Sequence, residues 1–269
     1  MHAHLTVPHS LSARPILSTA LRVARGLFVA TVVLVSTLTA TAAELKVVAP
    51  NAVKESITEI AARFERESGH RVVFSWGGSE SIARRVSEGE AFDVVVNTAA
   101  TVERFMGEGR LVAGTRADFA RSGVGVAVRA GLQRPDISTP DALRAALQAA
   151  PSIAISSGAS GRYLEQLFQR LGVAEQIRGR LKQPPSGAQI AEMIARGEAD
   201  LGFQQVTELL HAKGIEYLGP LPTEIQSYTV WSAARHPAGT TPEAASAFLQ
   251  ALMAPASGAA LRRAGMEKP

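Results

Sequence analysis

The densest group of hydroxyl and glycine residues in the chain follows a short apolar segment at residues 153–155. The six residues at 156–161 read SSGASG, and helix-forming residues begin directly after them. A loop of this composition between a strand and a helix has three possible chemistries. It could bind a phosphate group, present a nucleophilic serine, or bind another anion through hydroxyl and backbone N–H groups.

The spacing of these residues does not match the common motifs for the first two chemistries. A P-loop has the pattern G-x-x-x-x-G-K-[ST], and no lysine follows Gly161. A nucleophile elbow has the pattern G-x-S-x-G, whereas Gly158 and Gly161 stand at other distances from Ser160. The S-x-x-K arrangement is also absent, because Tyr163 stands three residues after Ser160. Binding of another anion is therefore the favoured chemistry.

Two further junctions between an apolar segment and a helical pattern have a similar character, APNA at residues 49–52 and WGGSE at 76–80. Helix N-termini expose unpaired N–H groups and a partial positive charge, and serine hydroxyls add donors. In open α/β sheets, ligands bind beyond the carboxyl ends of the strands. Helix capping by Ser or Asn is the favoured explanation of one such loop. Three of them in one chain favour a shared anion site.

Apolar, β-branched segments alternate with amphipathic helical patterns along the chain, which predicts an α/β fold. The expected strands cover residues 45–49, 71–75, 92–97, 124–129, 153–155, 201–204, 217–218 and 228–233. The expected helices cover residues 53–68, 188–196, 207–212, 242–253 and 256–264, with others around 81–86 and 102–106 and from 139 and 161 onward.

The order of these elements predicts two lobes with a cleft between them. We expect residues 44–124 to form the first part of lobe 1, residues 125–228 to form lobe 2, and residues 229–269 to return to lobe 1. The strands at 124–129 and 228–233 would then cross between the lobes. A cleft of this kind is a common place for a small ligand.

Residues 1–43 predict a secretory signal peptide, cleaved near Ala42 and Ala43, and therefore a periplasmic protein. Three arginines precede an apolar segment at residues 26–40, and residues 40–42 (ATA) form a small-residue cleavage pattern. The apolar segment is shorter than the roughly 20 residues of a membrane span. Retention of the segment as an N-terminal anchor is the alternative.

Charge and composition exclude several function classes. Without the three signal-peptide arginines, 25 Lys and Arg stand against 24 Asp and Glu, so no basic surface for nucleic acid is expected. The chain has no cysteine, which excludes thiol chemistry and thiolate metal sites. The histidines after the signal peptide, His70, His211 and His236, lack metal-ligand spacing. We therefore expect neither a metal nor a cofactor.

Longer motifs carry a family resemblance. In order they are LKVVAPNAVKESITEIAARFERESG, FSWGGSESIARRVSEGEAFDVVVN, ISSGASGRYLEQLFQRLG and GEADLGFQQVTELL. With the signal peptide, they resemble the periplasmic molybdate-binding protein family, type 2 solute-binding proteins of ABC transporters. The resemblance covers essentially the whole mature chain. It implies a two-lobed periplasmic binding protein type 2 fold, a small anionic ligand and an ABC permease as partner, and we expect a monomer.

The resemblance also implies site residues. That family binds its oxyanion through neutral hydrogen-bond donors. Its first-loop serine falls at Ala52, its second-loop serine is matched by Ser79, its backbone amides fall near Ser160 and Gly187, and its donor tyrosine falls at Gln205. Two of the three side-chain donors therefore differ, which favours an anion other than molybdate.

The other polar residues near these loops favour a carboxylate. Asn51, Gln204 and Gln205 are amides, and Arg162 offers a bidentate fork for a carboxylate, with a solvated helix face as the alternative for Arg162. A di- or tricarboxylate such as aconitate is the expected ligand. The expected ligand-binding residues are Asn51, Ala52, Ser79, Ser157, Gly158, Ser160, Gly161, Arg162, Tyr163, Gly187, Gln204 and Gln205.

One branch similar to this sequence is the periplasmic aconitate isomerase, which moves a proton between allylic carbons of aconitate. That reaction requires an acid/base group. Glu80 and Tyr163 are the catalytic candidates, and a structural role in the first turn of a helix is the alternative for Glu80. Three functions stay open: a carboxylate-binding protein, which is favoured; an aconitate isomerase; and the molybdate- or tungstate-binding component of an ABC transporter.

Overall fold

The first strand and helix show how the sequence pattern builds the fold. A computed structural model describes residues 1–4, 42–185 and 189–269, so the predicted signal peptide lies almost wholly outside the described residues. Strand β1 (Glu44–Pro50) leads through the 3-10 turn η1 (Asn51–Val53) into α2 (Lys54–Ser68). Helix α2 buries its apolar residues at the helical spacing seen in the sequence and ends at Gly69, whose φ of 73° suits glycine.

One half of the sheet surrounds β1. Its strand order is β2 (Arg71–Gly77), β1, β3 (Val94–Thr98), β9 (Tyr228–Arg235) and β4 (Ala117–Arg129). Strands β1, β2 and β3 are parallel, whereas β9 runs antiparallel to both β3 and β4. The helices of this half are α3 (Ser79–Ser87), α4 (Ala99–Gly107), α10 (Pro242–Met253) and α11 (Gly258–Arg263).

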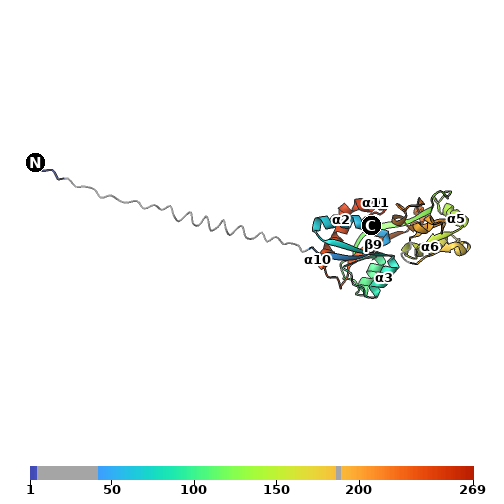
Figure 1. Ribbon diagram of the computed structural model, residues 1–269, viewed down its shortest axis with the longest axis horizontal. Coiled ribbons are helices and arrows are strands. Elements are labelled where there is room, and N and C mark those ends of the chain that lie inside the picture. The colour runs from blue at the N-terminus through green and yellow to red at the C-terminus, as the bar shows by residue number, and fades with distance from the viewer. Residues whose placement is uncertain (5–41, 186–188) are drawn as a thin grey trace. The chain divides into compact units, whose positions relative to one another are not determined.

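The other half of the sheet begins where β4 continues. The end of β4 pairs with β7 (Leu201–Gln205) and β8 (Ile215–Pro220), and β7 pairs in parallel with β5 (Ile153–Ile155), which pairs with β6 (Leu181–Lys182). The helices of this half are α5 (Pro140–Ala149), α6 (Ala159–Arg170), α7 (Ala174–Ile177), α8 (Ile190–Ala195) and α9 (Val206–Leu209). The 3-10 turns η2 (Arg178–Arg180) and η3 (Thr223–Ile225) also lie in this part of the chain, whereas η4 (Pro255–Ser257) lies between α10 and α11. Figure 1 shows α5 and α6 in one lobe and α2, α3, α10 and α11 in the other. The prediction of a two-lobed α/β fold is confirmed.

Strand β4 is longer than the sequence indicated. Only residues 124–129 alternate like a strand in the sequence, yet β4 begins at Ala117. Residues 117–123 read ADFARSG, in which the apolar alternation breaks at Ala120, where the pairing with β9 shifts in register. Backbone pairing rather than side-chain periodicity therefore defines this part of the strand. Strand β4 therefore contributes to both halves of the sheet and connects the two lobes.

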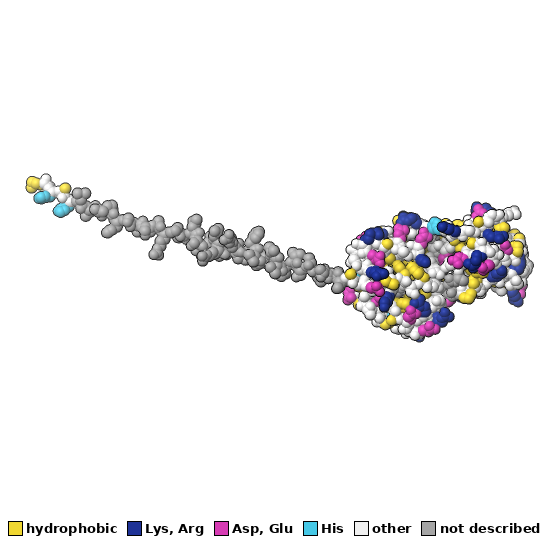
Figure 2. Space-filling view, in the orientation of Figure 1, with side chains coloured by type: hydrophobic (Ala, Val, Ile, Leu, Met, Phe, Trp, Pro, Cys, Tyr) yellow, Lys and Arg dark blue, Asp and Glu magenta, His cyan; other side chains and the backbone are white. Residues whose placement is uncertain are grey.

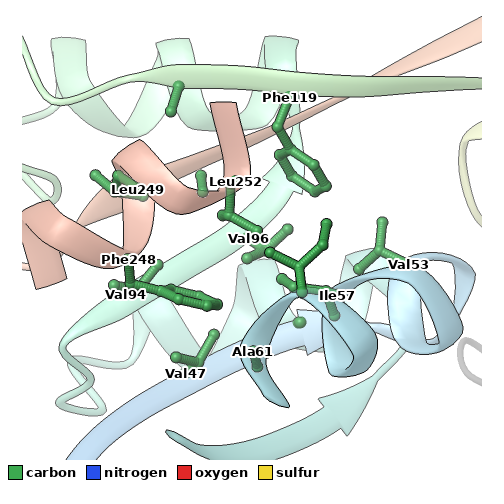
Figure 3. Packing of buried hydrophobic residues seen from close by; sticks show 14 of the residues in the cluster. Val47, Val53, Ile57, Ala61, Val94, Val96, Phe119, Phe248, Leu249 and Leu252 are labelled. Carbon is green, nitrogen blue, oxygen red and sulfur yellow. The ribbon is translucent and has the colours of Figure 1, made fainter. Parts of the chain in front are cut away.

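Each lobe has its own apolar core. In the first, Ile57 and Ala61 of α2 lie against β3 and against Phe248 and Leu252 of α10, as Figure 3 shows. The second packs β4, β5 and β7 against α5 and α6. Full burial of one such aliphatic or aromatic side chain contributes roughly 1.5–3 kcal/mol. The two lobes are thus separately stabilised, which leaves the junction loops between them to form a site.

Charges of both signs are mixed on the surface. On the face in Figure 2, Lys and Arg alternate with Asp and Glu over the described part of the chain.

Within the described residues no single helix is long and apolar enough to cross a membrane. Only the pair Pro242–Met253 and Pro255–Arg263, which is bent by 63°, passes the test of length and composition. Most of the apolar side chains of α10 lie in the core of the first lobe, which explains its composition.

Candidate functional site

The three strand-to-helix junctions singled out in the sequence meet at one cavity. Its walls are residues 50–52 after β1, residues 77–79 after β2 and residues 156–160 after β5. Pro185, Gln204, Gln205, Glu208 and Trp231 complete the lining. The volume of the cavity is about 40 Å³, and the cavity is partly open to solvent. The cavity therefore lies beyond the carboxyl ends of parallel strands from both lobes.

The helices that begin at this cavity are not capped by side chains. The N-cap residues of α3 and α6 are Gly78 and Gly158, and neither provides a side-chain hydrogen bond. Away from the cavity, Thr98 and Thr139 cap α4 and α5, each accepting a hydrogen bond from a backbone N–H. The serines at the cavity are thus not N-caps of these helices. First-turn N–H groups of α3 and α6 are available to an anion.

A buried amide fixes the junction after β2. Asn97 on β3 is fully buried, and its Nδ2 donates to the backbone oxygen of Ser79 at 3.0 Å. Its Oδ1 accepts from the N–H of Thr98 at 2.8 Å, so the orientation of the amide is set. The strand neighbouring β1 thereby holds the start of α3 in place without using the Ser79 hydroxyl.

The serine-rich loop presents an unsatisfied hydroxyl. Ser156 Oγ and Ser160 Oγ lie 3.0 Å apart and form a hydrogen bond. Ser157 Oγ is buried and has no partner within the described residues. Buried polar atoms without a partner are rare in folded proteins and call for an explanation. A ligand in the cavity would supply the missing hydrogen bond.

Gly161 has a packing role in this loop. A Cβ atom at this position would stand 1.5 Å from the backbone oxygen of Ser156. The loop folds back against the first turn of α6, and only glycine allows that approach. Gly161 lies beside the cavity and does not line it.

Side chains of β4, β7 and β9 form a hydrogen-bond network at the cavity. Trp231 Nε1 on β9 donates to Ser122 Oγ on β4 at 3.0 Å. The Gln205 amide on β7 lies 2.5 Å from Ser122 Oγ and 2.9 Å from Thr229 Oγ1. Its nitrogen faces Ser122, since the backbone oxygens of Ser122 and Gly123 are both 3.2 Å from that position. The Gln205 side chain therefore bridges β4 and β9 and has little capacity left for a ligand.

Glu208 is the one titratable residue among the described residues that line the cavity. Gln204 Nε2 donates to Glu208 Oε1 at 2.8 Å. Burial raises the pKa of the Glu208 carboxyl to about 8, although the hydrogen bond from Gln204 acts in the opposite direction. At neutral pH the carboxyl is mainly protonated and can donate a hydrogen bond to an anion.

Sequence reasoning missed Glu208 because it counted three strand-to-helix junctions. The link between β7 and α9 is a fourth, and its sequence QQVTE holds the two amides and the carboxyl. The same reasoning also missed Pro185 and Trp231 as cavity-lining residues. Pro50, Gly77, Gly78, Ser156 and Ala159 belong to the junctions that it singled out, although it did not name them as ligand contacts.

Besides Gly161, the structure places two further expected ligand contacts, Arg162 and Tyr163, outside the cavity. Arg162 forms an ion pair with Glu80, which joins α6 of one lobe to α3 of the other. Tyr163 Oη donates to the backbone oxygen of Ile225 at 2.6 Å and accepts from Arg170 Nη2 at 3.1 Å. Both residues follow the N-terminus of α6 by about a turn, and neither lines the cavity. Glu80 and Tyr163, the catalytic candidates from the sequence, therefore do not line it.

The remaining expected residues fall into two groups. Lining the cavity are Asn51, Ala52, Ser79, Ser157, Gly158, Ser160, Gln204 and Gln205. Gly187 lies outside the described residues. Across the described part of the chain no cluster of three or more His, Cys, Asp or Glu could hold a metal ion.

Replacing Arg162 by alanine is expected to change the free energy of unfolding by at most about 1 kcal/mol, because exposed ion pairs contribute little. The Arg162 and Glu80 side chains are 55% and 39% exposed. Ligand affinity should change by less than about threefold, as the side chain lies outside the cavity. Thermal unfolding and titration calorimetry measure both quantities. A tenfold loss of affinity would show that Arg162 contacts the ligand.

A two-lobed α/β fold whose cavity presents helix N-termini and neutral donors defines the class of extracellular solute-binding proteins. The family model described as bacterial extracellular solute-binding protein matches residues 45–267, and the chain belongs to this family. The resemblance stated from the sequence is thereby confirmed.

Curated relatives and a solved structure narrow the comparison. The chain is 31% identical to an aconitate isomerase of Pseudomonas sp. over 229 residues, which cover 83% of this chain and 87% of that protein. It is 27% identical to the molybdate-binding protein ModA of Azotobacter vinelandii, over 63% of this chain and 68% of the relative. The solved periplasmic molybdate-binding protein of Azotobacter vinelandii superimposes with a TM-score of 0.72 at 23% identity, covering 84% and 99% of the two chains, and supports the fold.

Proposed function

We propose that the protein captures a small organic anion, a di- or tricarboxylate such as aconitate, in the cavity between the lobes. The observation that carries this proposal is the donor set: two helices without side-chain caps begin at one cavity, and Ser157, whose buried hydroxyl has no partner in the described residues, lines it. Backbone N–H groups and hydroxyls bind anions without a formal counter-charge. A neutral Glu208 adds a carboxylic acid donor.

Two observations favour a carboxylate over molybdate. Ala52 and Gln205 stand where two side-chain donors of the molybdate-binding proteins are expected, and Gln205 is engaged between β4 and β9. The relative named aconitate isomerase matches more of this chain, at higher identity, than the molybdate-binding relative does. We place the protein in the periplasm, with an ABC permease as its partner when it serves uptake.

A thermal-shift panel tests the proposed ligand. The panel contains trans-aconitate, cis-aconitate, citrate, malonate, molybdate and sulfate. A ligand that binds only the folded state stabilises it by about 2.7 kcal/mol at a concentration of 100 times the Kd. We expect the melting temperature to rise with at least one of the carboxylates. A rise with molybdate and none with any carboxylate would overturn the proposal.

Aconitate isomerisation is the second candidate function. It is favoured by the 31% identity, over most of both chains, to a protein with that activity in its name. A titratable group in the cavity, which the reaction requires, is also present. Incubation of trans-aconitate with the protein, followed by chromatographic detection of the cis isomer, tests this candidate directly.

A further inference from the structure

We propose that Glu208 is the proton-transferring group of the cavity and that Gln204 is the residue that determines which of its oxygens carries the proton. This inference rests on the second candidate function, isomerisation of an unsaturated tricarboxylate. It replaces the candidates expected from the sequence, Glu80 and Tyr163, whose side chains lie outside the cavity.

Glu208 occupies the boundary between two spaces. It lines the inner cavity with the serine-rich loop, and it also lines an outer groove between α2 and the segment from α8 to α9. Among the described residues, Asn51 and Glu208 are the two that belong to both spaces. A carboxyl in this place can meet a ligand on one side and exchange its proton with solvent on the other.

Gln204 is fixed from its other end. Its Oε1 accepts a hydrogen bond from the N–H of Ile190, the first residue of α8, at 3.0 Å. The amide nitrogen therefore has to face Glu208, where Nε2 donates to Oε1. Gln204 is 2% exposed, so water does not compete for either bond. Oε1 of Glu208 is held as an acceptor, and the acid proton resides on Oε2.

The proposed step moves one proton and leaves the oxidation state of the ligand unchanged. The Glu208 carboxylate accepts a proton from the methylene carbon of trans-aconitate. As that C–H bond breaks, its electron pair enters the allylic system conjugated with the carboxylates. The resulting Glu208 carboxylic acid returns a proton to the other allylic carbon, a new C–H bond forms, and the double bond has moved. Glu208 ends as the carboxylate with which it began.

The rest of the cavity can stabilise the charge that develops during this step. The N-termini of α3 and α6 begin at the cavity where the carboxylates of the ligand would lie, and Ser157, whose buried hydroxyl has no partner in the described residues, lines it. Fixed donors aimed at developing negative charge are a large source of catalysis. Neutral donors do this without raising the acidity of Glu208 as a nearby arginine would.

The acidity of Glu208 suits the task. Burial raises its pKa to about 8, so both protonation states are accessible near neutral pH. Tyr217 on β8, which packs on α9, has a pKa raised to about 12 by burial and stays neutral. The charged groups that share the outer groove with Glu208 are Lys54, Glu55, Glu59 and Glu192.

The central experiment uses Glu208→Gln in the full chain, with Glu224→Gln, an exposed position outside both spaces, as the matched control. Proton NMR in D2O follows both isomerisation of trans-aconitate and deuterium incorporation at its methylene carbon. We expect Glu208→Gln to lower both rates by at least about 100-fold, in line with the loss of an acid/base group. Binding of trans-aconitate by this variant, measured by calorimetry, should persist. The Glu224→Gln protein should match the wild type in all three measurements.

The pH dependence of kcat tests whether Gln204 acts on the Glu208 carboxyl or only stabilises the fold. For the wild type, kcat should rise with pH, reach half of its maximum near pH 8, the pKa of Glu208, and level off above about pH 9. Gln204→Leu removes the hydrogen bond that lowers this pKa, so the midpoint should move to higher pH. An unchanged midpoint in that variant would overturn the role of Gln204. If Glu208→Gln does not fold, the wild-type profile still decides, because a rate independent of pH between 6 and 9 would overturn the role of Glu208.

The outcomes of the two proposals are distinguishable. Carboxylate binding without turnover or deuterium exchange overturns the role of Glu208 and leaves the binding function in place. Full turnover by Glu208→Gln also overturns the role of Glu208, but it leaves the isomerase function in place. Failure of the wild type to bind any carboxylate overturns the proposed function and this inference together.

Discussion

Replacement of Gly161 by alanine is expected to abolish ligand binding and to lower the free energy of unfolding by about 1–3 kcal/mol, the usual cost of overpacking. The new Cβ would stand 1.5 Å from the backbone oxygen of Ser156, so the loop at residues 156–160 has to move away from α6. That loop supplies Ser157 and the N-cap of α6 to the cavity. Affinity falls because the donors move together, although no ligand contact is removed.

The measurement combines unfolding in urea with a thermal-shift titration of the carboxylate that stabilises the wild type. Gly179→Ala is the matched control, since a Cβ at Gly179 meets nothing within 4 Å and its backbone angle suits alanine. That variant should keep the wild-type affinity. Ligand binding by Gly161→Ala within threefold of the control would contradict the assignment of this loop to the site.

The sequence predicted the fold well because periodic patterns reflect burial. The amphipathic spacing of α2 and the continuous apolar run of β3 both report which side chains face the core, and both elements form as expected. The first half of β4 escaped prediction because its residues are held by pairing with β9, a contact distant in sequence. Backbone pairing of this kind leaves no periodic trace in the strand itself.

The candidate site was only partly accessible from the sequence. Junction loops can be predicted, since strand ends and helix starts have local signatures. The direction of a side chain one turn into a helix depends on its tertiary partners. Arg162 points toward Glu80 of the other lobe, and the Tyr163 hydroxyl points to Ile225, 62 residues later in the chain. Glu208 and the serine-rich loop likewise line one cavity only through the tertiary structure.

Glu208 also has a consequence for stability. A raised carboxyl pKa means that the folded state holds a proton which the unfolded state releases above about pH 4.3, so stability declines as the pH rises from there toward 8. Functional groups of this kind reduce stability where they act. Glu208→Gln is therefore expected to melt at a higher temperature than the wild type at pH 7.5. A lower melting temperature would indicate that the carboxyl has a structural role.

The largest stability effect is expected at Asp93, far from the cavity. Its side chain is 2% exposed and accepts three backbone hydrogen bonds. Oδ2 accepts from Lys46 on β1 at 2.8 Å, and Oδ1 accepts from Thr240 and Thr241 at 2.7 and 3.1 Å. One carboxylate thus ties the entry to β3 to β1 and to the chain that leads into α10. These contacts join the first and last segments of the lobe.

We expect Asp93→Asn to lower the free energy of unfolding by about 3 kcal/mol at pH 7, because hydrogen bonds to a charged acceptor contribute roughly 1.5–3 kcal/mol each and the amide nitrogen would face backbone donors. Burial acts to raise the pKa of Asp93, yet its backbone and side-chain hydrogen bonds together hold it below the usual value. The contribution is therefore present above the unfolded pKa of about 3.9 and is lost as the pH falls through the folded pKa.

Urea unfolding of the wild type and Asp93→Asn from pH 7 down to pH 3 tests this expectation, and the difference between the two proteins should shrink on the acid side. Asp136→Asn is the matched control: Asp136 also accepts a backbone hydrogen bond, from Ser138 at 2.8 Å, but it is exposed. Burial lowers the pKa of His236, and the charge of Asp93 opposes that shift. The His236 ring should consequently titrate at a still lower pH in Asp93→Asn. A difference in the free energy of unfolding between the wild type and Asp93→Asn that persists unchanged to pH 3 would show that the charge of the Asp93 carboxylate does not hold these segments together.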